Sequence, residues 1–250
     1  MLRAMSGAQA LSNRRSVFSP GTGQQHWGTE YFGPRHAKEI GPEPQSLLTE
    51  MSPHEQILAH FHAVNQFHVY AAGSGSLGKH PLQPLMIQFM DHHTAYGPLV
   101  AGPQGFSFFA LRMQTDSGPT YLDRPGYKEK LKPSRRRSPL SAPIVLSTEP
   151  VLQHRPALTS EALFEVERFD DGLSAHILRM GAGMQTRGPA PQSTRGYYLF
   201  VVNGSMLFAG QEMGVWSMVA VGNDEDECRI EAGAKGLEVL LLEYPLTEAA

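Results

Sequence analysis

Three histidines and a glutamine lie within nine positions of one segment, at His60, His62, Gln66 and His68. Side chains two residues apart on a strand point to the same face, so His60 and His62 are expected to share one face. Gln66 and His68 have this parity too, after a break at residues 63–65. Two imidazoles at this spacing can share a metal ion, with each nitrogen at about 2.0–2.2 Å. The pattern therefore predicts a polar, metal-binding site on one face of a strand.

The alternative is a metal-free pocket in which the same side chains bind each other and a small polar ligand. Gln66 favours this alternative, because a neutral amide oxygen is a poorer ligand for a transition metal than a carboxylate is. Three neutral imidazoles can nevertheless hold Fe, Mn, Zn or Ni, with selectivity set by geometry. Burying these groups unpartnered costs roughly 1–3 kcal/mol each, so we expect a metal or a ligand to satisfy them.

The elements around this segment form an internal repeat with a constant offset of 131 positions. The matched pairs are Gly73 with Gly204, Ser74 with Ser205, Gly102 with Gly233, Gly105 with Gly236 and Leu111 with Leu242. Alternating apolar residues surround each match. A single register kept without a gap indicates an internal duplication.

Strand signals dominate both copies. The chain has 25 Gly and 19 Pro, which suits short strands joined by tight turns. We predict an all-β protein with a disordered leader (1–20), an N-terminal barrel (21–115), a linker (116–157) and a C-terminal barrel (158–248). The linker is rich in Pro, Ser and basic residues. We expect a solvated linker or lid rather than a polyanion contact, because no aromatic residues interleave its charges.

The segment from His60 to Gly73 resembles the first motif of the cupin superfamily: HxH, three residues, an acidic residue, six residues and Gly. Gln66 stands where the family has Glu. The segment HHTAYGP, residues 92–98, resembles the turn of the second cupin motif, with Tyr96 at the usual histidine place. Because the resemblance covers both copies, the chain is identified as a bicupin with two tandem double-stranded β-helix barrels.

The second copy lacks the chemical residues of the motif. Tyr197 corresponds to Gln66, and the HxH region is replaced by RGPAPQSTRG, from Arg187. We therefore expect a degenerate C-terminal barrel with a structural role.

The resemblance implies a cupin-type, metal-binding protein and favours a metal-dependent oxygenase that acts on a small organic substrate. The expected metal ligands are His60, His62, Gln66 and His93, with His92 as a further candidate. His68 and Tyr96 are expected to act as acid or base, since histidine titrates near neutral pH. The alternatives are a non-catalytic binding or sensing bicupin, and a non-redox isomerase.

Composition excludes several other classes. A net charge of −3 and a pI near 6.4 give no attraction to nucleic acid. No apolar run reaches the roughly 18 residues of a membrane helix. The single cysteine, Cys228, excludes an intramolecular disulfide, so we expect a cytoplasmic protein, and a homodimer on general grounds. The remaining histidines are expected at the surface or in loops: His26, His36, His54, His80, His154 and His176.

Overall fold

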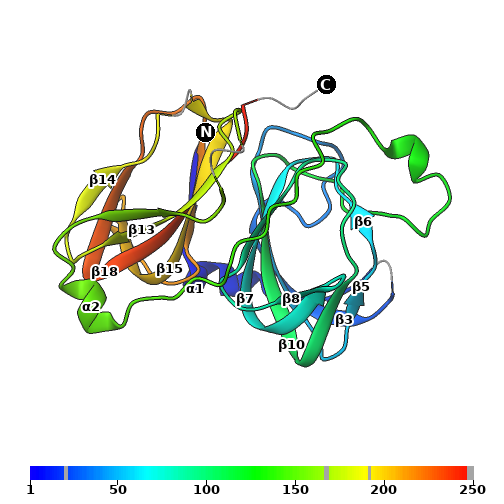
Figure 1. Ribbon diagram of the computed structural model, residues 1–250, viewed down its shortest axis with the longest axis horizontal. Helices are drawn as coiled ribbons and strands as arrows, with labels where there is room; N and C mark the ends of the chain where they lie inside the picture. Colours follow the sequence, from blue (N-terminus) through cyan, green and yellow to red (C-terminus); the bar gives the residue numbers. More distant parts are fainter. Residues whose placement is uncertain (20–21, 166–168, 191–192, 247–250) are drawn as a thin grey trace. The chain divides into compact units, whose positions relative to one another are not determined.

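The computed structural model describes residues 1–250 except 20–21, 166–168, 191–192 and 247–250. The described chain divides into two compact β units (Figure 1). The N-terminal unit contains residues 13–144, and the C-terminal unit contains residues 1–12 together with residues 145–246. Helices are short: α1 (Gly7–Ala10), α2 (Glu149–Gln153) and the 3-10 turns η1 (Leu11–Asn13) and η2 (Lys128–Lys130). None of the described helices has the length and apolar character to cross a bilayer.

Within its described residues, the N-terminal unit is a barrel built on one eight-stranded antiparallel sheet. The sheet runs in the order β2 (Arg15–Phe18), β3 (Gln25–Phe32), β4 (Gln45–Met51), β10 (Leu99–Arg112), β7 (Gln66–Leu77) and β8 (His80–Leu82). Strands β5 (Gln56–Ile57) and β9 (Ile87–Met90) pair with β10 and β7. A separate two-stranded ribbon joins β6 (His60–Phe61) to β11 (Thr120–Tyr121).

The described part of the C-terminal unit repeats this arrangement. Its sheet runs in the order β1 (Leu2–Met5), β17 (Met218–Gly222), β15 (Gly196–Phe208), β18 (Arg229–Glu243), β13 (Ser174–Met180) and β12 (Thr159–Ala162). Strands β14 (Gln185–Arg187) and β16 (Gln211–Met213) pair with β18 and β15. The prediction of two all-β barrels is confirmed.

Strand pairing confirms the duplication at the level of single residues. In the N-terminal unit Val69 pairs with Phe109, and in the C-terminal unit Phe200 pairs with Leu240, 131 positions later. The irregularities in pairing also coincide. The register of β7 shifts between Tyr70 and Ala72 against β10, and the register of β15 shifts between Val201 and Asn203 against β18.

The repeated glycines lie at a close approach of two strands. Gly73 has φ 76° and Gly204 has φ 68°, in the left-handed region that favours glycine. A Cβ at Gly73 would collide with the carbonyl oxygen of Gly105, and a Cβ at Gly204 would collide with that of Gly236. The glycine skeleton is therefore required by backbone geometry in both barrels.

The N-terminal residues differ from the expected disordered leader. Residues 2–5 form β1, which pairs with β17, and residues 15–18 form β2, which pairs with β3. Between them, Ser6 and Gln9 form a reciprocal capping box on α1. These residues are ordered because strand pairing and the cap satisfy their backbone groups.

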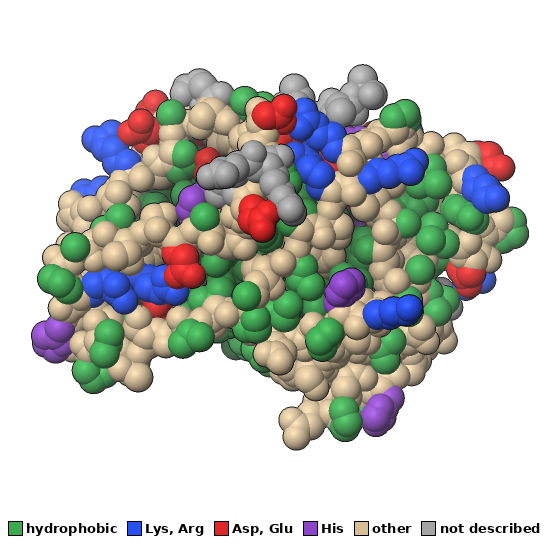
Figure 2. Space-filling view, in the orientation of Figure 1, with side chains coloured by type: hydrophobic (Ala, Val, Ile, Leu, Met, Phe, Trp, Pro, Cys, Tyr) green, Lys and Arg blue, Asp and Glu red, His purple; other side chains and the backbone are tan. Residues whose placement is uncertain are grey.

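The expected linker at 116–157 also differs, because most of it belongs to the N-terminal unit. An extended segment at residues 137–144 pairs with β9: Phe89 donates to Pro139 and Ser141 donates to Ile87. Arg137, expected to be solvated, forms two side-chain hydrogen bonds with Asp91, at 3.0 and 2.9 Å. Figure 2 shows Lys and Arg in several separate groups, with Asp and Glu between them.

Candidate functional site

The N-terminal barrel encloses a cavity of about 80 Å³. A single water needs roughly 10–15 Å³ by such a measure, so the cavity has room for a small organic molecule. The polar side chains that line it include His60, His62, His68, Tyr96 and Arg112, together with others such as His26 and Arg35, and apolar side chains such as Leu47, Phe108 and Leu99 form much of the remaining wall. A few polar groups in an apolar cavity are typical of a ligand site.

Backbone pairing fixes His60 next to Tyr96. The amide of each residue donates to the carbonyl of the other at 3.0 Å, and His60 also pairs with Tyr121 in β11. In the side chains, His60 Nδ1 donates to the Leu58 carbonyl at 2.6 Å, and His60 Nε2 lies 2.8 Å from the Tyr96 hydroxyl. Burial lowers the pKa of His60 to about 3, so its ring is neutral.

The ring of His62 is also held through Nδ1, in this case by a carboxylate. His62 Nδ1 donates to Asp116 Oδ2 at 2.6 Å, and Asp116 also accepts the amides of Ala63 and Gly118, at 3.3 and 2.9 Å. Burial alone would raise the pKa of Asp116, but the hydrogen bond from His62 and the charge of nearby Arg112 lower it. Asp116 is therefore an ionised, fixed acceptor that orients the His62 ring.

Gln66 faces the cavity side as its parity predicted, yet its amide is fully engaged by protein groups. Arg112 donates to Gln66 Oε1 through Nε at 3.0 Å and through Nη2 at 2.8 Å. Gln66 Nε2 donates to the Tyr96 hydroxyl at 2.8 Å. A second amide, Gln45, accepts from Arg112 Nη1 at 2.6 Å.

His68 is the third of the predicted site histidines that line this cavity. Its ring packs on Phe108, with centroids 4.7 Å apart, and lies 5.6 Å from the Tyr96 ring. His68 Nδ1 is buried and has no hydrogen-bond partner. Burial, with the charge of Arg112 nearby, lowers the pKa of His68 well below its usual value, so this imidazole is a neutral base.

His92 and His93 are not brought together with the other predicted site residues. His93 packs against Phe61, with ring centroids 5.4 Å apart. Phe61 lies between His60 and His62 in the sequence. His92 and His93 both line a different cavity, with Phe61 and Val64. His93 has φ 55°, and this turn directs its ring away from the cavity that His60 lines.

Three residues at this cavity have no signal in the sequence that predicted them as site residues: Arg112, Asp116 and His26. Arg112 and Asp116 complete the polar network, and Arg112 shares its strand parity with Phe108 and Ala110, which also line the cavity. His26, expected at the surface or in a loop, is buried and lines the same cavity. Its Nδ1 lies 2.8 Å from Oε1 of the fully buried Glu55, and its Nε2 has no hydrogen-bond partner.

The donor set fits a divalent ion through His60, His62 and Tyr96. Both histidines hold Nδ1 on an acceptor, which is the usual outer-shell support of a metal-bound imidazole. As the side chains stand, His60 Nε2 lies in a 2.8 Å hydrogen bond with the Tyr96 hydroxyl and His62 Nε2 lies 3.4 Å from Arg112 Nη2, so a bound ion would replace these contacts. Within the described part of the chain, no three His, Cys, Asp or Glu side chains converge on one ion, so Tyr96 is needed as the third donor.

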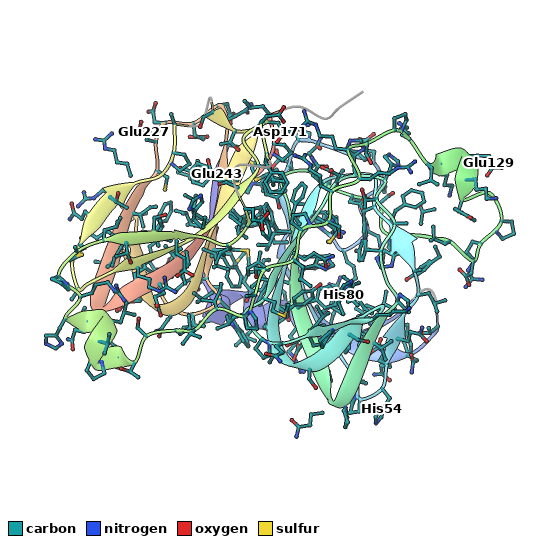
Figure 3. The ribbon with its side chains drawn as sticks, viewed as in Figure 1. His54, His80, Glu129, Asp171, Glu227 and Glu243 are labelled. Atoms are coloured by element: carbon teal, nitrogen blue, oxygen red, sulfur yellow. The ribbon has the colours of Figure 1, made fainter. Side chains whose placement is uncertain are left out.

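The C-terminal barrel fills the corresponding space with apolar side chains. Tyr197 and Leu199 stand at the positions of Gln66 and His68, and both belong to its buried core. Figure 3 labels Glu243 and Glu227, which correspond to Arg112 and Tyr96. Residues 191–192 of the segment that replaces the HxH motif lie outside the described residues. The described residues at these positions support the expected degenerate barrel.

No protein-family model and no curated protein matches the sequence. Solved structures match most of the chain at low identity. The salicylate 1,2-dioxygenase of Pseudaminobacter salicylatoxidans is 12% identical, with a TM-score of 0.56 over 97% of this chain and 84% of that one. The oxalate decarboxylase of Lactobacillus farciminis is 10% identical, with a TM-score of 0.55 over 98% and 87%. The quercetin 2,3-dioxygenase of Acinetobacter baumannii is 15% identical, with a TM-score of 0.50 over 98% and 79%. These likenesses concern the fold, and with the repeated barrels they show that the chain is a cupin-fold protein of the bicupin type.

Proposed function

We propose that the N-terminal barrel is the active barrel of a metal-dependent oxygenase acting on a small organic substrate. One observation carries this proposal: His60 and His62 each hold Nδ1 on a fixed acceptor while their rings line one small cavity. A bound divalent ion would supply open coordination positions for substrate and O₂. Similarity to two dioxygenase structures supports the reaction class.

The chain's own residues have separate tasks in this proposal. His60, His62 and Tyr96 would hold the ion, and Asp116 keeps His62 in the tautomer whose lone pair is on Nε2. His68, neutral and lacking a partner at Nδ1, would form a hydrogen bond with the substrate and would serve as acid or base only once a bound substrate or ion offsets the burial that lowers its pKa. The apolar wall excludes bulk water, which strengthens every polar interaction inside the cavity.

A second candidate, a metal-free small-molecule binding barrel, is favoured by a different observation. Arg112, Gln66, Tyr96 and His60 form a continuous hydrogen-bonded chain that is complete without an ion. A buried network satisfied by its own members is stable as it stands. In this case the ligand would meet the cavity-lining polar atoms that still lack partners, such as His68 Nδ1.

Elemental analysis of protein purified without chelator or nickel resin separates the two candidates. We expect near-stoichiometric Fe, Mn, Zn or Ni in the wild type and its loss in a His60→Ala/His62→Ala double variant. The matched control is His54→Ala/His80→Ala, because both histidines, labelled in Figure 3, are exposed and neither lines the cavity. Oxygen uptake with salicylate as the first probe would then test the reaction. A folded wild type that takes up no divalent ion would leave the binding barrel as the better account.

A further inference from the structure

Arg112 fixes the orientation of the Gln66 amide. A guanidinium has only donors, and Arg112 directs Nε and Nη2 at one atom of Gln66, at 3.0 and 2.8 Å. That atom must be the amide oxygen. The NH₂ group of Gln66 therefore points to the Tyr96 hydroxyl, 2.8 Å away, and donates a hydrogen bond to it.

Leu58 fixes His60 in the same way. The carbonyl of Leu58 can only accept, so His60 Nδ1 carries the proton that bridges their 2.6 Å contact. The neutral ring then has its lone pair on Nε2, which faces the Tyr96 hydroxyl at 2.8 Å. Tyr96 accepts from Gln66 on one side, so its own proton is directed to His60 on the other.

This proton covers the lone pair through which His60 would bind a metal ion. We propose that Gln66, which offers Tyr96 a donor and no free acceptor, leaves the Tyr96 proton on His60 Nε2, so that the N-terminal barrel binds a metal ion more weakly than it would with an acceptor at position 66. The inference deepens the proposed function, because it concerns the residue that sets the affinity of the same site.

A glutamate at this position would reverse the direction of the bond. Its carboxylate would accept from Arg112 and also from the Tyr96 hydroxyl, because a charged acceptor forms the stronger hydrogen bond. Tyr96 would then donate to residue 66 instead of His60, and His60 Nε2 would be free. Gln66→Glu is therefore the informative variant. Gln66→Met is its matched control, because it removes the amide without adding an acceptor.

Two measurements test the inference. In metal-free protein, ¹⁵N NMR of the His60 ring should show a hydrogen-bonded Nε2 in the wild type and in Gln66→Met. The same signal should move to the position of a free nitrogen in Gln66→Glu and in Tyr96→Phe. Calorimetric titration with Zn²⁺ should give Gln66→Glu an affinity higher than that of the wild type by roughly 10-fold or more, with no gain in Gln66→Met.

An unchanged His60 signal in Gln66→Glu, or an equal gain of Zn²⁺ affinity in Gln66→Met, would overturn the inference. If Gln66→Glu does not fold, the comparison of wild type with Tyr96→Phe still decides, since an unchanged His60 signal there excludes the Tyr96 hydrogen bond. Failure of the proposed function has a different signature. In that case the wild type binds no metal, while the His60 signal still moves in Gln66→Glu.

Discussion

The hydroxyl of Tyr96 lies 2.8 Å from Nε2 of His60, and the backbones of the same two residues form a two-way antiparallel bridge. The side-chain contact therefore does not depend on flexible rotamers alone, because strand pairing fixes both ends of it. A site positioned by backbone pairing is more precise than one held on loops. Substitutions that spare this bridge should change the chemistry of the cavity without changing its shape.

Asp116→Asn is expected to disturb His62 more than the fold. An amide can turn its NH₂ group toward His62 Nδ1 and force the ring proton to the other nitrogen. We expect Zn²⁺ affinity to fall by about 10–100-fold, as for other outer-shell partners, and the His62 tautomer to change in ¹⁵N NMR. Asp123→Asn is the control, since Asp123 is 53% exposed in the same segment. Wild-type NMR signals for His62 in Asp116→Asn would contradict the role of Asp116.

Gly73→Ala and Gly204→Ala are expected to destabilise their barrels to a similar extent. Each adds a left-handed alanine and a collision with a backbone carbonyl. The control is Gly210→Ala, because Gly210 has φ 78° and no atom within 4 Å of its added Cβ. Left-handed strain alone costs about 1–2 kcal/mol, and the collision should add about 1–3 kcal/mol in urea denaturation. Equal losses in all three variants would show that the close approach does not matter.

The stability of the metal-free protein should fall in mild acid. Burial lowers the pKa of His60 to about 3 and that of His68 well below its usual value, so below pH 6.5 the unfolded chain binds protons that the folded chain does not. Each such histidine lowers the free energy of unfolding by up to about 1.4 kcal/mol per pH unit below 6.5. Urea denaturation at pH 7, 6 and 5 should give a smaller decrease for His68→Gln than for the wild type.

His80→Gln is the matched control for this measurement, since His80 is exposed. It should keep the pH dependence of the wild type. A stability that does not change between pH 7 and 5 would show that the buried histidines titrate as they do in the unfolded chain.

A homodimer remains our prediction, because symmetric dimers are the commonest soluble oligomers. Light scattering at several protein concentrations should give a mass about twice the 27.5 kDa of one chain. The mass of a single chain at every concentration would contradict it.

The repeat could be predicted from the sequence because backbone geometry requires particular residues. Gly73 and Gly204 tolerate no side chain, so their spacing survives in the sequence. The boundaries could not be predicted. Residues 2–5 gain order only by pairing with β17, more than 200 residues later, and local composition contains no signal of such a partner.

The alternation of side chains along the strand also predicted part of the site, namely its three histidines. It placed His60 and His62 on one face and brought His68 to the same cavity. Its place in the 92–98 turn made His93 a candidate, but His93 has a left-handed backbone and lines a different cavity. Asp116 lies in a loop with no periodicity, so only the fold reveals it as the partner of His62.

The strand β1 has a consequence for how the chain is made on the ribosome. Residues 13–144 are contiguous, so the N-terminal barrel can fold as soon as they emerge. Strand β1 is synthesised well before its partner, because Leu2 pairs with Val221, more than 200 residues later. Until β17 has been synthesised, the backbone groups that β1 pairs with it have no partner there. A neighbouring nascent copy offers the same β17 edge. Two chains could therefore exchange their β1 strands through the same pairing that β1 makes within one chain.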